Sequence, residues 1–255
     1  MCQLLGVSAA QPIELNPWLR TLFSHSTEHP HGWGLAVFRG GQVNIEKEPL
    51  TAWQSGYLES RLKRPVRAAA AIAHIRRASV GVMAYENCHP FSARDISGRT
   101  WTLAHNGTLF LPNGTERFRE LQEGDTDSER ALLYLVSSIN EAIELAQGQL
   151  SLLERFRTAE RAVRELAPEN PLTLLFYDGE LLYAHSNQPG HLCTRREGDA
   201  VLFATVPMDE ETWEPVEQRR LFAYCAGELI FRGEEHPYEY LLPESKAQHM
   251  DYSQL

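Results

Sequence analysis

The order of elements along the chain predicts an α+β fold, in which helices cover antiparallel sheets in layers. Short apolar strands separated by turns fill the first third of the sequence, two amphipathic helices follow, and strands then return. Strands grouped apart from helices are typical of this layered class. The 255 residues contain no internal repeat and no linker-like stretch within residues 1–235, so we expect a single domain over residues 1–255.

The strands of the first third are short apolar runs bounded by turn residues. They are expected at 3–8, 35–39, 42–46, 68–75 and 100–104. Gly40-Gly41 lies between two of them and favours a hairpin turn. Asn16 followed by Pro17 predicts a helix start with Asn16 as the N-cap, leading into residues 18–24.

Two capping boxes predict the central helices. Thr126 is followed three residues later by Glu129, and Ser151 by Glu154, which is the spacing that satisfies the first backbone N–H groups of a helix. Pro168 is expected to end the second helix. Apolar residues follow each box at helical spacing: Leu132, Leu135, Val136, Ile139 and Ile143, then Leu152, Phe156, Ala159, Val163 and Leu166.

The last third returns to strands. Asp178-Gly179 predicts a hairpin turn between residues 172–177 and 181–185. Further strands are expected at 201–205, 221–224 and 228–232. The polar tail from about residue 236 to residue 255 is expected to be loosely ordered.

Composition excludes several classes of function. The formal net charge of −10 argues against a nucleic-acid partner, which requires a basic face, and against anionic membranes. No apolar run approaches the length that spans a bilayer, and no secretory signal is visible. The four cysteines lie far apart without a CxxC pair, so we expect neither disulfides nor a structural metal, and a cytoplasmic location. Nothing indicates a cofactor.

Cys2 is a candidate nucleophile. Ordinary removal of Met1 would leave Cys2 as the amino terminus, with a thiol and a free α-amine on adjacent carbons. The amine is partly uncharged near neutral pH and is therefore available as the base for the thiol. A lone cysteine carries no spacing information, so the hypothesis depends on finding the other groups that such a nucleophile needs.

Two segments are candidates for positioning a substrate. In the run His31-Gly32-Trp33-Gly34, glycines on either side of an aromatic residue permit unusual backbone conformations, although an ordinary turn is the alternative. His25, His29 and His31 are close in sequence, but their spacing matches no zinc pattern.

The segment from His74 to Gly81 places Arg76 at the end of an apolar strand, from which its guanidinium could bind a carboxylate. Asn87-Cys88-His89-Pro90-Phe91 follows, with His89 as a loop histidine.

Asn106 and Gly107 could supply an oxyanion hole. They follow a predicted strand, and the Asn106 amide and the Gly107 N–H are two adjacent donors that could converge on one oxygen. Asp127, in the first turn of a predicted helix, complements the helix dipole and could also bind a ligand ammonium.

In order and combination these motifs resemble the class II glutamine amidotransferase domain, an N-terminal-nucleophile (Ntn) hydrolase, and most closely its stand-alone YafJ-like type. The motifs cover residues 2–130: Cys2 to Gly6, His31 to Gly34, His74 to Arg77, Asn87 to Phe91, Ala104 to Gly107 and Thr126 to Glu129.

The resemblance implies a four-layer αββα sandwich of two antiparallel sheets and hydrolysis of the glutamine amide through a Cys2 thioester, releasing ammonia. It assigns the nucleophile to Cys2 and the oxyanion hole to Asn106 and Gly107. It assigns the substrate carboxylate to Arg76 and the substrate ammonium to Asp127. Supporting substrate contacts are implied for Ser79, His89, Gly32 and Trp33.

The chain departs from the fused synthase members, which usually have an aromatic residue where it has Arg77 and threonine where it has Ser79. Whether Arg76 or Arg77 holds the carboxylate therefore stays open. The resemblance also leaves room for an unidentified ammonia-accepting synthase partner and for a homo-oligomer. Two other functions remain as alternatives: hydrolysis of a γ-glutamyl amide on a larger metabolite, and non-catalytic glutamine binding.

Overall fold

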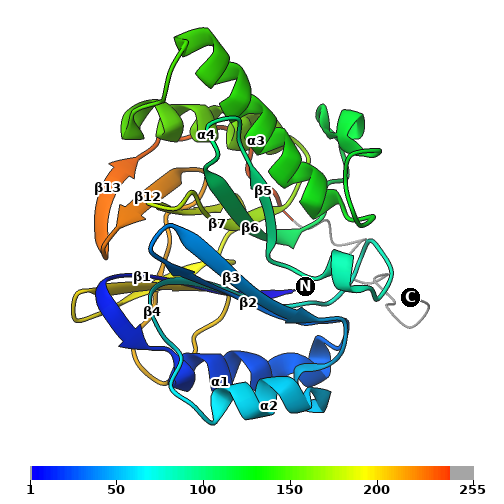
Figure 1. Cartoon of the computed structure of the whole chain (residues 1–255), viewed down its shortest axis with the longest axis vertical. Helices are drawn as coiled ribbons and strands as arrows, with labels where there is room; N and C mark the ends of the chain where they lie inside the picture. Colours follow the sequence, from blue (N-terminus) through cyan, green and yellow to red (C-terminus); the bar gives the residue numbers. More distant parts are fainter. Residues whose placement is uncertain (1, 242–255) are drawn as a thin grey trace.

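The computed structural model describes residues 2–241 and forms four layers (Figure 1). Two antiparallel sheets lie face to face, with helices α1 and α2 outside one sheet and helices α3 and α4 outside the other. The predicted α+β sandwich of two antiparallel sheets is therefore confirmed. Within residues 2–241, none of the helices is both long and apolar enough to cross a bilayer.

The first sheet has the strand order β11-β9-β10-β1-β4-β2-β3, and the second has the order β13-β12-β8-β7-β6-β5. The strands of the first sheet are β1 (Gln3–Glu14), β2 (Trp33–Arg39), β3 (Gln42–Glu48), β4 (Arg67–Ile75), β9 (Cys193–Glu197), β10 (Ala200–Ala204) and β11 (Glu214–Pro215). Those of the second are β5 (Phe91–Arg94), β6 (Thr100–Gly107), β7 (Leu172–Tyr177), β8 (Leu182–Ser186), β12 (Leu221–Cys225) and β13 (Glu228–Arg232).

The outer layers are helical. Their α-helices are α1 (Asn16–Ser24), α2 (Gly56–Leu62), α3 (Asp127–Ala146) and α4 (Leu152–Leu166). Short 3-10 helices occur at His25–Glu28, Ala52–Gln54, Tyr85–Asn87 and Thr115–Phe118. The capping box predicted at Ser151 and Glu154 is present in full. Thr126 also caps its helix, but the Glu129 carboxylate instead accepts from the N–H groups of Glu123 and Gly124.

Small residues let the two sheets approach each other. The layer between them includes Ala36, Ala70, Ala104 and Ala184. A Cβ atom on Gly6 would lie 2.9 Å from a methyl carbon of Leu175 in the opposite sheet. The small side chains therefore bring residues at the edges of the two sheets close enough to form one site.

The register brings several strand ends to one edge of the sandwich. Strand β1 lies between β4 and β10, because Gln3 pairs with Ile75 and Leu5 pairs with Ala204. The residue before β1 is therefore flanked on one side by the segment after β4 and on the other by the segment after β10.

One local prediction, the N-cap of α1, needs correction. Asn16 is the first residue of α1 rather than its N-cap, and Leu15 takes the N-cap position. The Asn16 amide donates to Leu62 O and Arg64 O, and its oxygen accepts from the N–H of Val66. Asn16 thus connects α1 to the segment before β4, a tertiary role that local spacing does not reveal.

The tail expected to be loose from about residue 236 is held by hydrogen bonds at its beginning. The N–H of His236 donates to Arg219 O at 3.0 Å, and that of Tyr240 donates to Asn187 O at 2.9 Å. His236 is buried. Residues 242–255 lie outside the described part of the chain.

Candidate active site

The Cys2 thiol lies directly before β1, at the end of the sheet where β4 and β10 finish. Its sulfur accepts a hydrogen bond from the Arg77 N–H at 3.3 Å and donates one to Arg77 O at 3.5 Å. Burial raises the pKa of this thiol, while the Arg77 backbone hydrogen bond and the Arg76 charge lower it and the Asp127 carboxylate raises it further. The predicted cation and anion thus both act on the thiol.

Asn106 and Cys2 line the same cavity, of about 200 Å³. Asn106 comes from β6 of the second sheet and is buried. Its neighbour Gly107 can only be glycine, since a Cβ atom there would lie 1.9 Å from Pro171 O and 2.4 Å from His105 Nε2. The structure therefore brings the predicted nucleophile together with the predicted oxyanion turn.

Arg76 is almost completely buried, with 2% of its surface exposed. Its guanidinium donates to three backbone carbonyls of the segment 80–82, at 3.1 Å to Val82 O, 2.7 Å to Val80 O and 2.9 Å to Gly81 O. Its own N–H donates to Gly32 O at 2.7 Å. Arg76 therefore holds the loop after β4 in addition to acting on the thiol.

Ser79, in the same loop, reaches the oxyanion turn. Its hydroxyl lies 2.7 Å from that of Thr108, the residue after Gly107. The preceding N–H, of Ala78, donates to His31 Nδ1 at 2.8 Å. Residues 78–82 thus bridge the ends of β4 and β6, one strand from each sheet.

Asp127 is the first residue of α3 and is buried. Its Oδ2 accepts from the N–H of Leu109, two residues beyond Gly107. This hydrogen bond fixes the carboxylate beside the turn that carries the predicted oxyanion donors.

Gly32 supports the site through its backbone. Its φ is +138°, and a Cβ atom there would lie 2.6 Å from Cys88 Sγ. The backbone conformation in which Gly32 O accepts from the Arg76 backbone N–H therefore requires glycine.

Trp33 and His89 have buried side chains with partners in the protein interior, and their contacts with substrate stay predictions. The Trp33 side chain packs in the core beneath the first sheet with Phe23, and its indole N–H donates to Glu48. His89 is buried and lies against His74, with ring centroids 4.2 Å apart. Burial lowers the pKa of His89 well below its usual value, so it is a neutral interior residue.

Besides Gln3, the neighbour of Cys2, four residues that the sequence interpretation missed line the cavity with Cys2 and Asn106. Gly190 and His191 lie in the loop after β8, and Thr205 and Val206 follow β10. Only the pairing of β1 with β10 and the stacking of the two sheets bring these residues to the nucleophile. The Pro189-Gly190 turn was the one local signal available.

The three clustered histidines have separate partners. His25 Nδ1 lies 2.7 Å from Gln3 Oε1, His29 Nδ1 lies 2.8 Å from His25 O, and His31 accepts from Ala78. Each ring is thus used in local structure.

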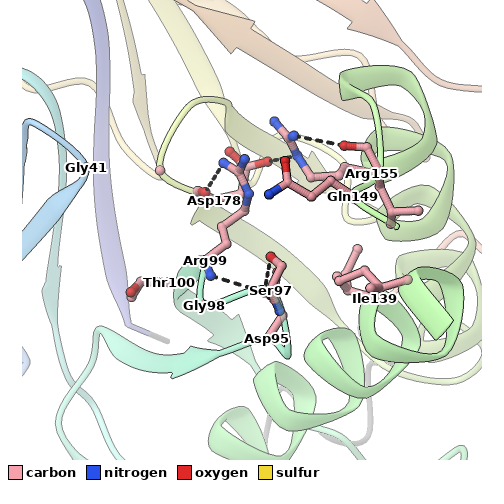
Figure 2. Close-up of a pocket in the computed structure, with 13 residues that line it drawn as sticks. Gly41, Asp95, Ser97, Gly98, Arg99, Thr100, Ile139, Gln149, Arg155 and Asp178 are labelled. Atoms are coloured by element: carbon pink, nitrogen blue, oxygen red, sulfur yellow. Dashed lines mark hydrogen bonds and ion pairs between the residues drawn. The ribbon is translucent and has the colours of Figure 1, made fainter. Parts of the chain in front are cut away.

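A second cavity, of about 270 Å³, lies beside α3 and α4 at the opposite end of β6 (Figure 2). Its arginines have partners: Arg155 pairs with the Asp178 carboxylate at 2.9 Å, and Arg99 donates to the backbone carbonyl of Asp178 at 2.9 Å. Strand β6 runs from Thr100, beside this cavity, to Gly107 at the site, a span of roughly 23 Å. This cavity is therefore separate from the site at Cys2.

The fold and the grouping of these motifs define an Ntn-type amidotransferase domain. The family model described as "Glutamine amidotransferases class-II" matches residues 1–198, and the chain belongs to this family. The Escherichia coli (strain K12) protein described as "Putative glutamine amidotransferase YafJ" is 29% identical over 259 residues, which cover 90% of this chain and 100% of the relative. The resemblance to the stand-alone YafJ-like type is thereby confirmed.

Solved structures agree on the fold. The structure of a "predicted glutamine amidotransferase from Pseudomonas aeruginosa PA01" is 24% identical with a TM-score of 0.61, covering 90% of this chain and 100% of that one. Glutamine phosphoribosylpyrophosphate amidotransferase from B. subtilis is 18% identical with a TM-score of 0.65, covering 90% of this chain and 48% of that one.

Proposed function

We propose that this chain hydrolyses the side-chain amide of glutamine through a Cys2 thioester. The observation that carries the proposal is the cavity shared by Cys2 and Asn106, with Arg76 and Asp127 both acting on the thiol. Glutamine has a carboxylate and an ammonium at one end and an uncharged amide at the other. A cation, an anion and a nucleophile in one site match those three features.

In the first half of the reaction, the Cys2 sulfur attacks the amide carbon and gives its proton to the α-amine of the same residue. Negative charge develops on the carbonyl oxygen, where the Asn106 amide and the Gly107 N–H stabilise it. The C–N bond then breaks as the amine returns the proton to the leaving nitrogen, and ammonia departs. Free solution or a partner synthase receives this ammonia.

In the second half, water attacks the thioester carbon, the C–S bond breaks and glutamate is released. The same two donors stabilise the second oxyanion. These donors accelerate both steps because they bind the transition state more strongly than the ground state.

The free amine of Cys2 is essential to this proposal. While Met1 is attached, the nitrogen of Cys2 belongs to a peptide bond and cannot act as a base. Since burial raises the pKa of the thiol, the unprocessed chain is expected to be inactive.

Mass spectrometry of the intact protein, before and after an electrophilic glutamine analogue, tests the assignment. We expect the Met1-free form to gain one covalent adduct on Cys2, and the Cys2→Ala variant to gain none and to release no glutamate. A Cys2→Ala variant that still turns over glutamine would rule out the thioester.

The cavity also favours a second candidate, a γ-glutamyl amide that carries a substituent on its nitrogen. The cavity has a volume of about 200 Å³. This volume is far larger than an ammonia or a water molecule needs, since one water molecule occupies about 30 Å³ in the liquid. Comparing kcat/KM for glutamine and for γ-glutamyl conjugates distinguishes the two candidates.

A further inference from the structure

Two different surroundings flank the Cys2 sulfur. On the β4 side lie Arg76 and the loop 78–82, in which Gly81 lies against Asp125 and Thr126, the residues before Asp127. On the β10 side lies the cavity, which Arg76 and Asp127 do not line. A glutamine held by its charged end on the β4 side would therefore extend its side-chain amide across the end of β1 towards the β10 side.

The β10 side is suited to an uncharged amine. Its other lining residues, besides Cys2 and Asn106, are Gln3, Gly190, His191, Thr205 and Val206, so no Asp, Glu, Lys or Arg is among the lining residues of the described chain. Burial lowers the pKa of His191, which leaves a neutral imidazole that can accept a hydrogen bond from an amine N–H.

The loop that carries His191 is held in place. The His191 N–H donates to Gln188 O at 3.3 Å, and the Gln188 amide donates to Thr173 Oγ1 at 3.3 Å. Thr173 pairs with Asn106 across β6 and β7. The His191 residue itself lines the cavity, so its ring can contact a ligand held there.

We propose that the cavity between Cys2 and the Gly190-His191 loop is the subsite for the leaving amine, and that His191 sets the size of amine that this subsite accepts. This inference rests on the proposed function, since it requires an acyl-enzyme on Cys2. By microscopic reversibility, a nucleophile that resolves the thioester enters through the same subsite.

Competition between two added amines isolates this step. Hydroxylamine or O-methylhydroxylamine attacks the thioester carbon through nitrogen, the C–S bond breaks, and a proton from the nitrogen passes to the Cys2 thiolate. The products are γ-glutamyl hydroxamate and its O-methyl form. Both arise from one acyl-enzyme, so their ratio does not depend on how fast that intermediate forms or on how much protein is folded.

The experiment supplies glutamine with both amines and measures the product ratio by mass spectrometry. His191→Phe fills more of the subsite and is expected to lower the share of the O-methyl product at least fivefold. His191→Ala enlarges the subsite and is expected to raise that share at least twofold. Ser79→Ala, a matched change on the β4 side, is expected to alter total turnover but not the ratio.

The two histidine variants make opposite predictions, and either one alone is a sufficient test if the other does not fold. An unchanged ratio, or a shift in the same direction in both variants, would overturn the assignment while leaving the thioester intact. A wild-type protein that forms neither glutamate nor hydroxamate would instead refute the proposed function itself.

Discussion

The choice between Arg76 and Arg77 can be decided by replacing each with lysine. Arg76 donates three hydrogen bonds to the carbonyls of residues 80–82, and each bond from a charged donor contributes about 1.5–3 kcal/mol. Two of the three bonds come from one nitrogen, Nη2, so the single nitrogen of a lysine can replace those two but not the third. We therefore expect Arg76→Lys to lower the free energy of unfolding by about 1.5–3 kcal/mol, as one bond is lost.

The same substitution replaces a two-pronged carboxylate partner with a point charge. For glutamine we expect kcat/KM to fall by about 10–100-fold, equivalent to roughly 1.4–2.8 kcal/mol. Arg77→Lys is the matched control, since the Arg77 hydrogen bonds to Cys2 come from its backbone and survive the change.

The assay compares glutamine with 4-aminobutanamide, which is glutamine without its α-carboxylate. If Arg76 binds the carboxylate, Arg76→Lys lowers kcat/KM for glutamine much more than for 4-aminobutanamide. A purely structural role would lower both equally. The ratio to follow is kcat/KM for glutamine divided by kcat/KM for 4-aminobutanamide. If this ratio is unchanged in Arg76→Lys, or if it falls in Arg77→Lys instead, Arg76 is not the residue that binds the carboxylate.

Three further predictions follow from the geometry. Asn106→Ala is expected to reduce kcat by about 10²–10³ with little change in KM, because its contribution appears with the oxyanion; steady-state kinetics would contradict this if only KM rose. Gly107→Ala is expected to yield unstable protein by thermal unfolding, because its Cβ would lie 1.9 Å from Pro171 O; a melting temperature equal to wild type would show that the turn can move. Burial lowers the pKa of His185 to about 3, against an ordinary value of about 6.5. The unfolded chain therefore binds a proton between these pH values that the folded chain does not. Stability from this group is complete above pH 6.5 and falls as the pH decreases, by about 1.4 kcal/mol per pH unit. Urea unfolding from pH 7 to pH 5 measures this slope, and His185→Gln should reduce it; an equal slope in both proteins would contradict the cause.

Local sequence signals predicted most of the strands and helices. Gly40-Gly41 and Asp178-Gly179 form the expected hairpin turns, and Ser151 caps its helix as its spacing indicated. Each of these features depends on residues within a few positions of one another. Asn16 was misassigned because its amide bonds to residues 62–66, a contact that depends on the tertiary fold.

The site could be predicted only in part, for the same reason. Cys2, Arg76, Asn106 and Asp127 lie at strand or helix ends, where short motifs mark them. His191 carries no motif, and it reaches the cavity only because the two sheets stack and their strands end at a common edge.

The asymmetry around β1 connects fold and chemistry. The β4 side is occupied by a buried guanidinium that is already committed to a loop, so this side has little room to vary without unfolding that loop. The β10 side includes the loop residues Gly190 and His191, which can change with little effect on the core, although Thr205 accepts from the Leu4 N–H and Val206 packs against the core. If the proposed function holds, we expect a domain built this way to keep recognition of the glutamyl end fixed, while differences in the amine it releases or accepts arise on the opposite side of the same sulfur.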